Sequence, residues 1–208
     1  MIQYYTGHAR PGVLPALDNM HRDRKRVFVD MRKWNVPVID GQYEIDQFDS
    51  EHAVYLISAG DNGEHFGSIR LLPTERPHLL GSIFPHLCGG PPPAGPGIWE
   101  ITRGCLSPRL RATERLRVRN RLTTAAVQFA LLFDIDRFVC VADSAWLTQI
   151  LTLGWSCEPL GDPILIDGAM TGALQIHISG RTIDQLRDAG NYASVRLQLG
   201  DTVSPIAA

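Results

Sequence analysis

The sequence has few lysines, no paired cysteines and no long apolar run, and each absence narrows the class of protein. Only Lys25 and Lys33 are lysines among its 20 basic residues, so arginine carries nearly all the positive charge. No stretch approaches the ~18 apolar residues that span a bilayer. Residues 1–18 lack the basic start and apolar run of a signal peptide. We therefore expect a cytoplasmic protein without a membrane span.

Motifs that hold metals or nucleotide cofactors are also missing from the sequence. The four cysteines lie far apart without a Cys-x-x-Cys pair, and the seven histidines show neither His-x-x-x-His nor His-Glu-x-x-His spacing. No Gly-x-Gly-x-x-Gly or Walker loop is present, and no serine lies in a Gly-x-Ser-x-Gly elbow. We therefore expect no metal, no bound cofactor and no serine-hydrolase chemistry.

The composition is that of an ordinary globular protein. Apolar residues make up 44% of the 208 positions, charged residues 20%, and the formal net charge is −2. This balance does not favour a nucleic acid as partner. Neither a repeat nor a Ser/Gly linker divides the chain, so we expect a single domain over residues 1–208, with a loose tail from about Asn191.

Hydrophobic periodicity predicts a mixed α/β protein. Helices are expected over residues 13–31, 78–87, 113–133, 144–153 and 182–189. Strands are expected over residues 53–59, 65–73, 98–106, 137–142, 155–160 and 171–179. Residues 34–49 have little periodicity, and such a long irregular stretch in a compact domain is more often functional than idle. The element order predicts an α/β three-layer sandwich with a mixed, mostly antiparallel sheet.

Glu100 is a candidate catalytic residue in the strand Trp99-Glu100-Ile101-Thr102-Arg103. Alternation puts Glu100 and Thr102 on one face and Arg103 on the other, unless a bulge intervenes. A carboxylate buried among apolar neighbours needs a partner or a task. Two interpretations remain open: an ion pair with a neighbouring arginine such as Arg70, or a general base with a raised pKa.

Acids, arginines and aromatics gather in the N-terminal half of the chain. Separately, each charge is expected to be solvated or paired. Together they would suit a zwitterionic, cationic ligand, because acids bind an amine, arginines a carboxylate and aromatics a sulfonium or purine. The residues are Arg24, Phe28, Trp34, Asp46, Asp49, Arg70, Glu100 and Arg103.

An arginine run follows the strand over residues 98–106. Its spacing on alternate residues does not match one helical face, so part of it is expected to be loop. It is either a solvated face or a site for phosphate or an acidic partner protein; nucleic acid is disfavoured because no aromatics are interleaved. The run comprises Arg109, Arg111, Arg115, Arg117, Arg119 and Arg121.

Six motifs, in this order and spacing, resemble the signature of the acyl-homoserine lactone (LuxI-type autoinducer) synthases. Weaker similarity continues through Gly154-Trp155 to about residue 187. The motifs are Arg24-Lys25-Arg26-Val27-Phe28, Trp34, Glu44-Ile45-Asp46-Gln47-Phe48-Asp49, Gly67-Ser68-Ile69-Arg70-Leu71-Leu72-Pro73-Thr74, Phe84-Pro85-His86-Leu87 and Trp99-Glu100-Ile101-Thr102-Arg103.

This resemblance implies an N-acetyltransferase-like fold and a two-step reaction. An acyl group passes from acyl-CoA or an acyl carrier protein to the amine of S-adenosylmethionine, and lactonisation then releases methylthioadenosine. Glu100 would deprotonate the amine, with Thr102 beside it. The other seven residues of the N-terminal cluster would hold S-adenosylmethionine. The carrier would dock on Arg109, Arg111, Arg115 and Arg117.

The resemblance also implies an acyl pocket, and here the sequence departs from the family pattern. Gly104 stands where an aromatic residue is usual. Cys140 stands where a threonine accompanies 3-oxo products in some members, so we expect an acyl chain without a 3-oxo group. The segment around Trp146 is similar to that of members using branched or aryl acyl-CoA, although core packing explains Trp146 equally. The expected pocket comprises Leu72, Phe84, Gly104, Cys140 and Trp146.

Two alternatives remain beside the synthase. Another acyl-CoA N-acyltransferase of the same fold would carry an Arg-x-x-Gly-x-Gly/Ala loop, which the sequence lacks. A non-catalytic module using the arginine run would bind nucleic acid or an acidic protein in a salt-sensitive way, with Glu100 dispensable.

Overall fold

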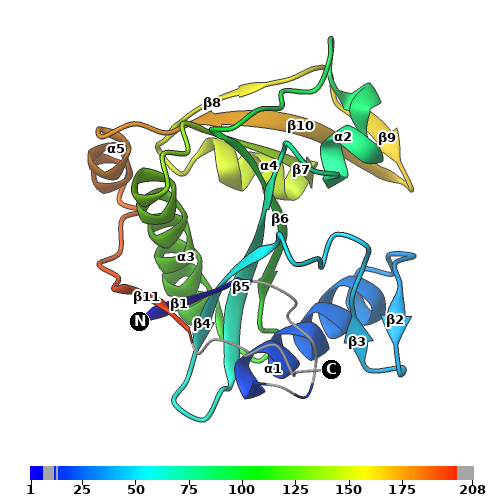
Figure 1. The fold of residues 1–208 in the computed structure, drawn as a ribbon, viewed down its shortest axis with the longest axis vertical. Helices are drawn as coiled ribbons and strands as arrows, with labels where there is room; N and C mark the ends of the chain where they lie inside the picture. The colour runs from blue at the N-terminus through cyan, green and yellow to red at the C-terminus, as the bar shows by residue number, and fades with distance from the viewer. Residues whose placement is uncertain (7–11, 13, 201–208) are drawn as a thin grey trace. The chain divides into compact units, whose positions relative to one another are not determined.

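The computed structural model describes residues 1–6, 12 and 14–200 (Figure 1). Val13, the first residue of one predicted helix, and the last eight residues of the predicted tail lie outside this range. The chain divides into two compact units. The first comprises the described parts of Met1–Arg70, Arg103–Ala125 and residues 194–200, and the second comprises Leu71–Thr102 and Ala126–Ala193.

The first unit contains the N-terminal helix and a small group of strands. In its sheet β4 lies between β1 and β5, β1 pairs antiparallel with β4, and β11 pairs parallel with β1. The strands are β1 (Ile2–Thr6), β4 (Val54–Ala59), β5 (His65–Pro73, which continues into the second unit) and β11 (Leu197–Leu199), and a separate hairpin joins β2 (Val38–Ile39) to β3 (Tyr43–Glu44).

The turn between β4 and β5 follows directly from its residues. Gly63 has φ +78°, a left-handed conformation that glycine adopts without steric cost, and the side chain of Asn62 accepts a hydrogen bond from the N–H of Glu64. The predicted hairpin at Asp61-Asn62-Gly63 is therefore confirmed, as are the strands on both sides of it.

Helix α1 (Pro15–Arg24) continues directly into a π-helix, Lys25–Met31. Pro15 suits the first turn because it has no N–H to leave unpaired. The buried face of α1 includes Leu17 and Met20. In the π-helix the N–H of Arg32 reaches the carbonyl of Val27 over 3.0 Å. Single π turns often occur at functional sites. The predicted helical segment is confirmed, whereas the π-helical part was not predicted.

The second unit is built on a mixed sheet. Its strands are ordered β5-β6-β7-β10-β8, with β9 also paired to β10; β6 and β7 run parallel, and β10 is antiparallel to its three partners. The strands are β6 (Ile98–Leu106, whose end lies in the first unit), β7 (Arg137–Asp143), β8 (Ser156–Pro159), β9 (Ile164–Ile166) and β10 (Ala169–His177). The prediction of a mixed, mostly antiparallel sheet is confirmed.

Four further α-helices, α2 to α5, lie within the described residues. Helix α4 is capped by Asp143, whose carboxylate accepts the N–H of Trp146 over 3.0 Å. The helices are α2 (Leu79–Ser82), α3 (Ala112–Leu132, which runs through both units), α4 (Ser144–Leu151) and α5 (Thr182–Asp188). No helix of the described residues is long and apolar enough to cross a membrane.

Some elements differ from the sequence predictions. The helix expected over residues 78–87 is two short pieces, α2 and a 3₁₀ turn at Pro85–Leu87, because Pro85 cannot donate the backbone hydrogen bond that would continue α2. Strands β1, β9 and β11 and the β2–β3 hairpin were not predicted. β11 lies within the tail that was expected to be loose.

Candidate active site

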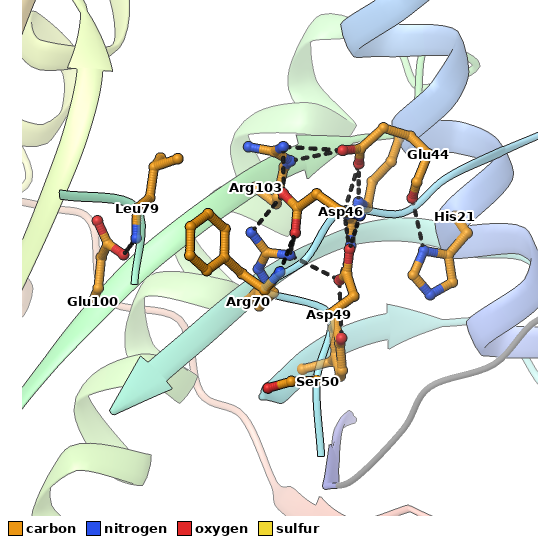
Figure 2. Close-up of polar contacts among 12 residues, drawn as sticks. His21, Glu44, Asp46, Asp49, Ser50, Arg70, Leu79, Glu100 and Arg103 are labelled. Atoms are coloured by element: carbon orange, nitrogen blue, oxygen red, sulfur yellow. Dashed lines mark hydrogen bonds and ion pairs between the residues drawn. The ribbon is translucent and has the colours of Figure 1, made fainter. Parts of the chain in front are cut away.

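Three arginines and three carboxylates of the first unit form a buried charge network. Each side chain is at most 7% exposed. Figure 2 shows Arg70, Arg103, Glu44, Asp46 and Asp49 pointing toward one another. The charge network comprises Arg24, Arg70, Arg103, Glu44, Asp46 and Asp49.

Arg24 and Arg70 both bind acidic residues of the segment that begins at the end of β3 and leads to β4. Arg24 grips Asp49 with both terminal nitrogens, at 2.8 and 2.9 Å, and donates through Nε to Glu44 at 2.6 Å. Arg70 donates to Asp46 at 2.6 and 3.1 Å and approaches Asp49 to 2.9 Å. Such two-pronged contacts fix orientation as well as charge.

Arg103 joins the network from β6 because the strand geometry changes at this residue. Its φ of +51° lies in the left-handed region, where a non-glycine residue is strained. Its Nε donates to Glu44 at 3.0 Å and its Nη2 to Asp46 at 2.6 Å. The regular alternation of buried residues in β6 ends at this point. The backbone of β6 thus departs from regular strand geometry at Arg103, so simple alternation does not decide where this side chain points.

Two carboxylates of the network, those of Asp46 and Asp49, are held in their charged form. Burial alone would raise the pKa of Asp46 and Asp49, but the adjacent arginines reverse this effect and lower both. Arg24 lowers the pKa of Asp49, and Arg70 lowers both. Since three positive and three negative side chains meet, the network is electrically balanced.

Phe28 and Trp34 lie beside this network. Their rings stack at a centroid distance of 4.9 Å with an interplanar angle of 5°. The guanidinium of Arg103 lies 5.7 Å from the Phe28 ring and joins the aromatic pair to the charges. Phe28 is buried, whereas Trp34 is 40% exposed. The structure thus brings together the predicted ligand-binding residues of this unit.

Two members of this arrangement, Glu44 and Tyr55, were not predicted as site residues from the sequence. Glu44 is fully buried and binds both Arg24 and Arg103. Tyr55 donates its hydroxyl to Asp49 at 2.9 Å. A signal existed for Glu44, which lies two residues before Asp46 in an irregular segment. None existed for Tyr55, which looks like an ordinary core residue of β4.

Glu100 in the second unit is fully buried and is held by backbone groups. Its Oε2 accepts the N–H of Leu79 at 2.7 Å, as Figure 2 shows, and its Oε1 accepts the N–H of Leu80 at 2.8 Å. The sequence suggested either an arginine partner for Glu100 or a role as general base. The two backbone amides are partners that neither interpretation included. Thr102, two residues along β6, is also buried.

The strands β6 and β7 stay paired over only part of their length. Their parallel register covers Ile98–Ile101 against Arg137–Cys140, while β7 continues to Asp143 along β10. The backbone beyond Ile101 and Cys140 therefore lies outside this ladder.

An apolar cluster of the second unit contains one predicted acyl-pocket residue, Phe84. Its buried centre is Leu80, Leu87, Ile98, Val139 and Ala173, and Phe84 and Val141 pack against it. Glu100 lies opposite Val139 in the β6–β7 register.

The other predicted acyl-pocket residues have different settings. Leu72 and Cys140 are buried, and burial raises the pKa of the Cys140 thiol to about 12. Trp146 is half-buried on α4. Gly104 is half-buried and belongs to the first unit, whereas the other four residues belong to the second.

The arginines proposed for carrier docking also differ in their settings. Arg109 and Arg111 precede α3, so part of the run is loop, as predicted. Arg109 binds the buried Asp23, and Arg115 donates to the carbonyl of Ser107 at 3.2 Å. Arg111 and Arg117 are exposed.

Among the described residues no cluster of His, Cys, Asp or Glu could hold a metal ion.

The fold defines the class of protein first. A solved structure assigned to the N-acetyltransferases, from Lactobacillus plantarum, superposes with a TM-score of 0.56 at 15% identity and covers 86% of this chain and 98% of that chain. Such a likeness concerns the fold alone, and it gives the chain an N-acetyltransferase-like α/β fold.

The sequence then identifies the family. The family model described as autoinducer synthase matches residues 14–186. The isovaleryl-homoserine lactone synthase of Bradyrhizobium diazoefficiens is 29% identical over 192 residues, which is 92% of this chain and 86% of that protein. The chain belongs to the autoinducer synthase family, and it is an acyltransferase.

Solved structures of a synthase resemble the whole chain. The CoA-dependent acyl-homoserine lactone synthase BjaI with MTA has a TM-score of 0.83 at 29% identity, covering 100% of this chain and 95% of that chain. The same synthase with SAM and isopentyl-CoA has a TM-score of 0.81 at 28% identity, covering 100% and 96%.

Proposed function

We propose that this chain is an N-acyl-homoserine lactone synthase that makes a quorum-sensing signal from S-adenosylmethionine and an acyl thioester. The observation that carries this proposal is the likeness over the full chain to BjaI, a synthase whose structure contains SAM and isopentyl-CoA. The 15% identity to an N-acetyltransferase supports the fold only, so another N-acyltransferase of this fold is not favoured.

The charge network and the aromatic pair support binding of S-adenosylmethionine. This substrate carries a sulfonium, an amine, a carboxylate and a purine. The exposed ring of Trp34 offers a surface for the sulfonium or the purine. The balanced network supplies fixed guanidinium and carboxylate groups for the polar end. We assign this role to Arg24, Phe28, Trp34, Asp46, Asp49, Arg70 and Arg103.

We assign amide formation to the end of β6. The amine of S-adenosylmethionine loses a proton to Glu100, and its nitrogen attacks the thioester carbonyl. The new C–N bond replaces the C–S bond, and the carrier thiol leaves. The bonds from Leu79 and Leu80 support this role because they orient the carboxylate. Thr102 lies on the same strand face as Glu100.

Lactonisation follows without a further base. The methionine carboxylate attacks the γ-carbon, the C–S bond to the sulfonium breaks, and methylthioadenosine leaves with the electron pair. A sulfonium is already a good leaving group, so this step mainly needs positioning of the two reacting atoms. Both S-adenosylmethionine and the thioester are substrates, and we propose no further cofactor.

The donor and the acyl chain are finer proposals. The CoA-dependence of BjaI supports acyl-CoA over an acyl carrier protein. We propose that the predicted acyl-pocket residues of the second unit, Leu72, Phe84, Cys140 and Trp146, line the acyl chain. We also propose that the neutral thiol of Cys140 accompanies a product without a 3-oxo group. We also propose one synthase domain, supported by the single family match over residues 14–186, in a cytoplasmic enzyme.

One assay tests the proposed function. Purified protein is incubated with S-adenosylmethionine and a panel of acyl-CoA and acyl-carrier-protein thioesters, and mass spectrometry detects the lactone and methylthioadenosine. Both products are expected in equal amounts from at least one acyl-CoA. Absence of both products with every donor, combined with salt-sensitive binding of an acidic protein or nucleic acid, would instead support the non-catalytic module.

A further inference from the structure

A second buried carboxylate of the first unit, Asp23, lies outside the charge network. Each of its two oxygens accepts a hydrogen bond from one terminal nitrogen of Arg109, and both bonds are 2.9 Å long. His65 contacts the same carboxylate through Nδ1 at 2.9 Å, and Arg26 donates to it at 3.0 Å. The side chain of Asp23 is 1% exposed, so its charge depends on these partners.

His65 extends this arrangement into the sheet. Because the carboxylate of Asp23 accepts, Nδ1 carries the ring proton, and Nε2 accepts the hydroxyl of Ser68 over 3.0 Å. Burial lowers the pKa of His65, although Asp23 opposes this effect, so the ring is neutral near pH 7. We call Asp23, His65, Ser68 and Arg109 the Asp23 cluster.

The serine, histidine and aspartate of this cluster have the order of a hydrolytic triad but not its accessibility. Asp23, His65 and Ser68 are all buried, so the hydroxyl of Ser68 faces protein rather than a substrate. A nucleophile must reach its substrate. The contacts therefore indicate a positioning role.

Arg109 joins three separate segments of the first unit. It binds Asp23 on α1, it donates to the backbone carbonyl of His65 at the start of β5 at 3.2 Å, and it belongs to the loop that precedes α3. Its side chain is 43% exposed. Nevertheless, both terminal nitrogens of its guanidinium donate to the buried carboxylate of Asp23. An anionic carrier would have to compete with this carboxylate for the same two nitrogens, which we call the Arg109 fork.

The position of Asp23 connects this cluster to the charge network. Asp23 and Arg24 are consecutive residues at the end of α1, and successive helical residues point about 100° apart. One side chain is therefore fixed in the Asp23 cluster while the next is fixed against Glu44 and Asp49. A shift or rotation of α1 that lengthens the first set of bonds also displaces the guanidinium of Arg24.

We infer that Arg109 is a positioning residue for the S-adenosylmethionine side of the active site, acting through Asp23 and α1, and not a contact for the acyl carrier. This inference rests on the proposed function, and it replaces the carrier-docking role that the family resemblance implied for Arg109. Displacements of the order of 1 Å at a reacting or binding group cost large factors in rate. Loss of the Arg109 fork should therefore weaken S-adenosylmethionine binding more than donor binding.

The test compares Arg109→Gln with the wild-type protein and with Arg181→Gln, a matched change at an exposed arginine of the second unit. Calorimetry measures binding of S-adenosylmethionine without a donor, steady-state kinetics give the KM of each substrate, and circular dichroism checks folding. We expect the dissociation constant for S-adenosylmethionine to rise about tenfold in Arg109→Gln. The KM for acyl-CoA should stay within about twofold, and Arg181→Gln should match the wild type.

The outcomes separate this inference from the proposed function. If the wild type neither binds S-adenosylmethionine nor makes lactone, the proposed function fails. If the wild type does both, a raised KM for acyl-CoA with unchanged S-adenosylmethionine binding in Arg109→Gln overturns the inference, as does no change in either. Should Arg109→Gln not fold, Arg109→Lys keeps the charge but loses the fork, and the same criteria apply to it.

Discussion

The carboxylate of Glu100 accepts a 2.7 Å hydrogen bond from the backbone N–H of Leu79, 21 positions earlier in the chain. A second bond of 2.8 Å comes from the next amide, that of Leu80. Both donors are peptide groups at the start of α2, and together they orient the carboxylate of the proposed base. The position of α2 then decides where the Glu100 carboxylate lies.

Replacing Glu100 with glutamine should abolish most amide formation while keeping the fold. The change removes the proton acceptor, and its amide nitrogen also meets a backbone N–H that needs an acceptor. A positioned general base contributes about 10²–10⁴-fold in rate, so kcat should fall by at least about 100-fold. Mass spectrometry of the lactone gives the rate, and circular dichroism verifies folding. A variant that turns over normally would show that Glu100 is not the base.

Gly81→Ala should disturb the same carboxylate indirectly. A Cβ at Gly81 would lie 2.7 Å from two ring atoms of His78. The ring cannot rotate away freely, because its Nδ1 is hydrogen-bonded to the carbonyl of Arg76 at 2.8 Å. Overpacking costs about 1–3 kcal/mol and the gain in helix propensity returns about 1 kcal/mol, so the expected net loss is about 1 kcal/mol.

A loss of about 1 kcal/mol leaves nearly all of the protein folded, so by itself it would hardly change kcat. Because α2 must shift to accommodate the new Cβ, we nevertheless expect kcat to fall several-fold. Gly90→Ala is the matched control, since a Cβ there meets nothing within 4 Å. Thermal unfolding and lactone kinetics are measured for both variants. Equal behaviour of the two would mean that His78 moves aside and that α2 does not set the position of Glu100.

The elements that the sequence predicted are those with a strong local pattern. Alternation marked β5 and β6 within a residue of their observed ends, and Asp61-Asn62-Gly63 marked the turn before β5. Strand β11 has only three residues and exists because it pairs with β1. Such a short edge strand has no local pattern and is set by tertiary pairing.

The chemistry of the site was predictable by residue type but not by partner. A buried glutamate in β6 was visible from Trp99 and Ile101 around it. Its actual partners are backbone amides, which every residue has and which leave no mark in the sequence. The bonds of Glu44 reach residues 20 and 59 positions away, a separation that only the folded chain closes.

Acid should destabilise the protein from about pH 5 downward. Asp23, Asp46 and Asp49 have pKa values below their ordinary value of 3.8 in the folded chain. Burial raises each pKa, but hydrogen bonds and nearby positive charges outweigh it. The unfolded chain therefore takes up protons first, so stability is present above the ordinary pKa and is lost as pH falls through the lowered values.

His65 also makes the folded chain less stable as the pH falls, and its effect begins at a higher pH than that of the aspartates. Its pKa is lowered from 6.5, so the unfolded chain binds this proton first as the pH falls below about 6.5. Urea unfolding between pH 8 and pH 4 measures the combined effect. Because these groups are buried, 0.5 M salt should change the slope little. A free energy of unfolding that is constant down to pH 4 would contradict the assigned ion pairs.

Trp34→Ala should weaken substrate binding without much loss of stability. Trp34 is 40% exposed and stacks on Phe28 at 4.9 Å. An aromatic pair contributes about 0.5–1.5 kcal/mol, so the fold should persist. The cation–π and stacking contacts proposed for S-adenosylmethionine would be lost, and its KM should rise about tenfold with the KM for acyl-CoA unchanged. Trp34→Phe, which keeps a ring on Phe28, should recover most of the affinity. If alanine and phenylalanine raise the KM equally, the ring of Trp34 does not contact the substrate.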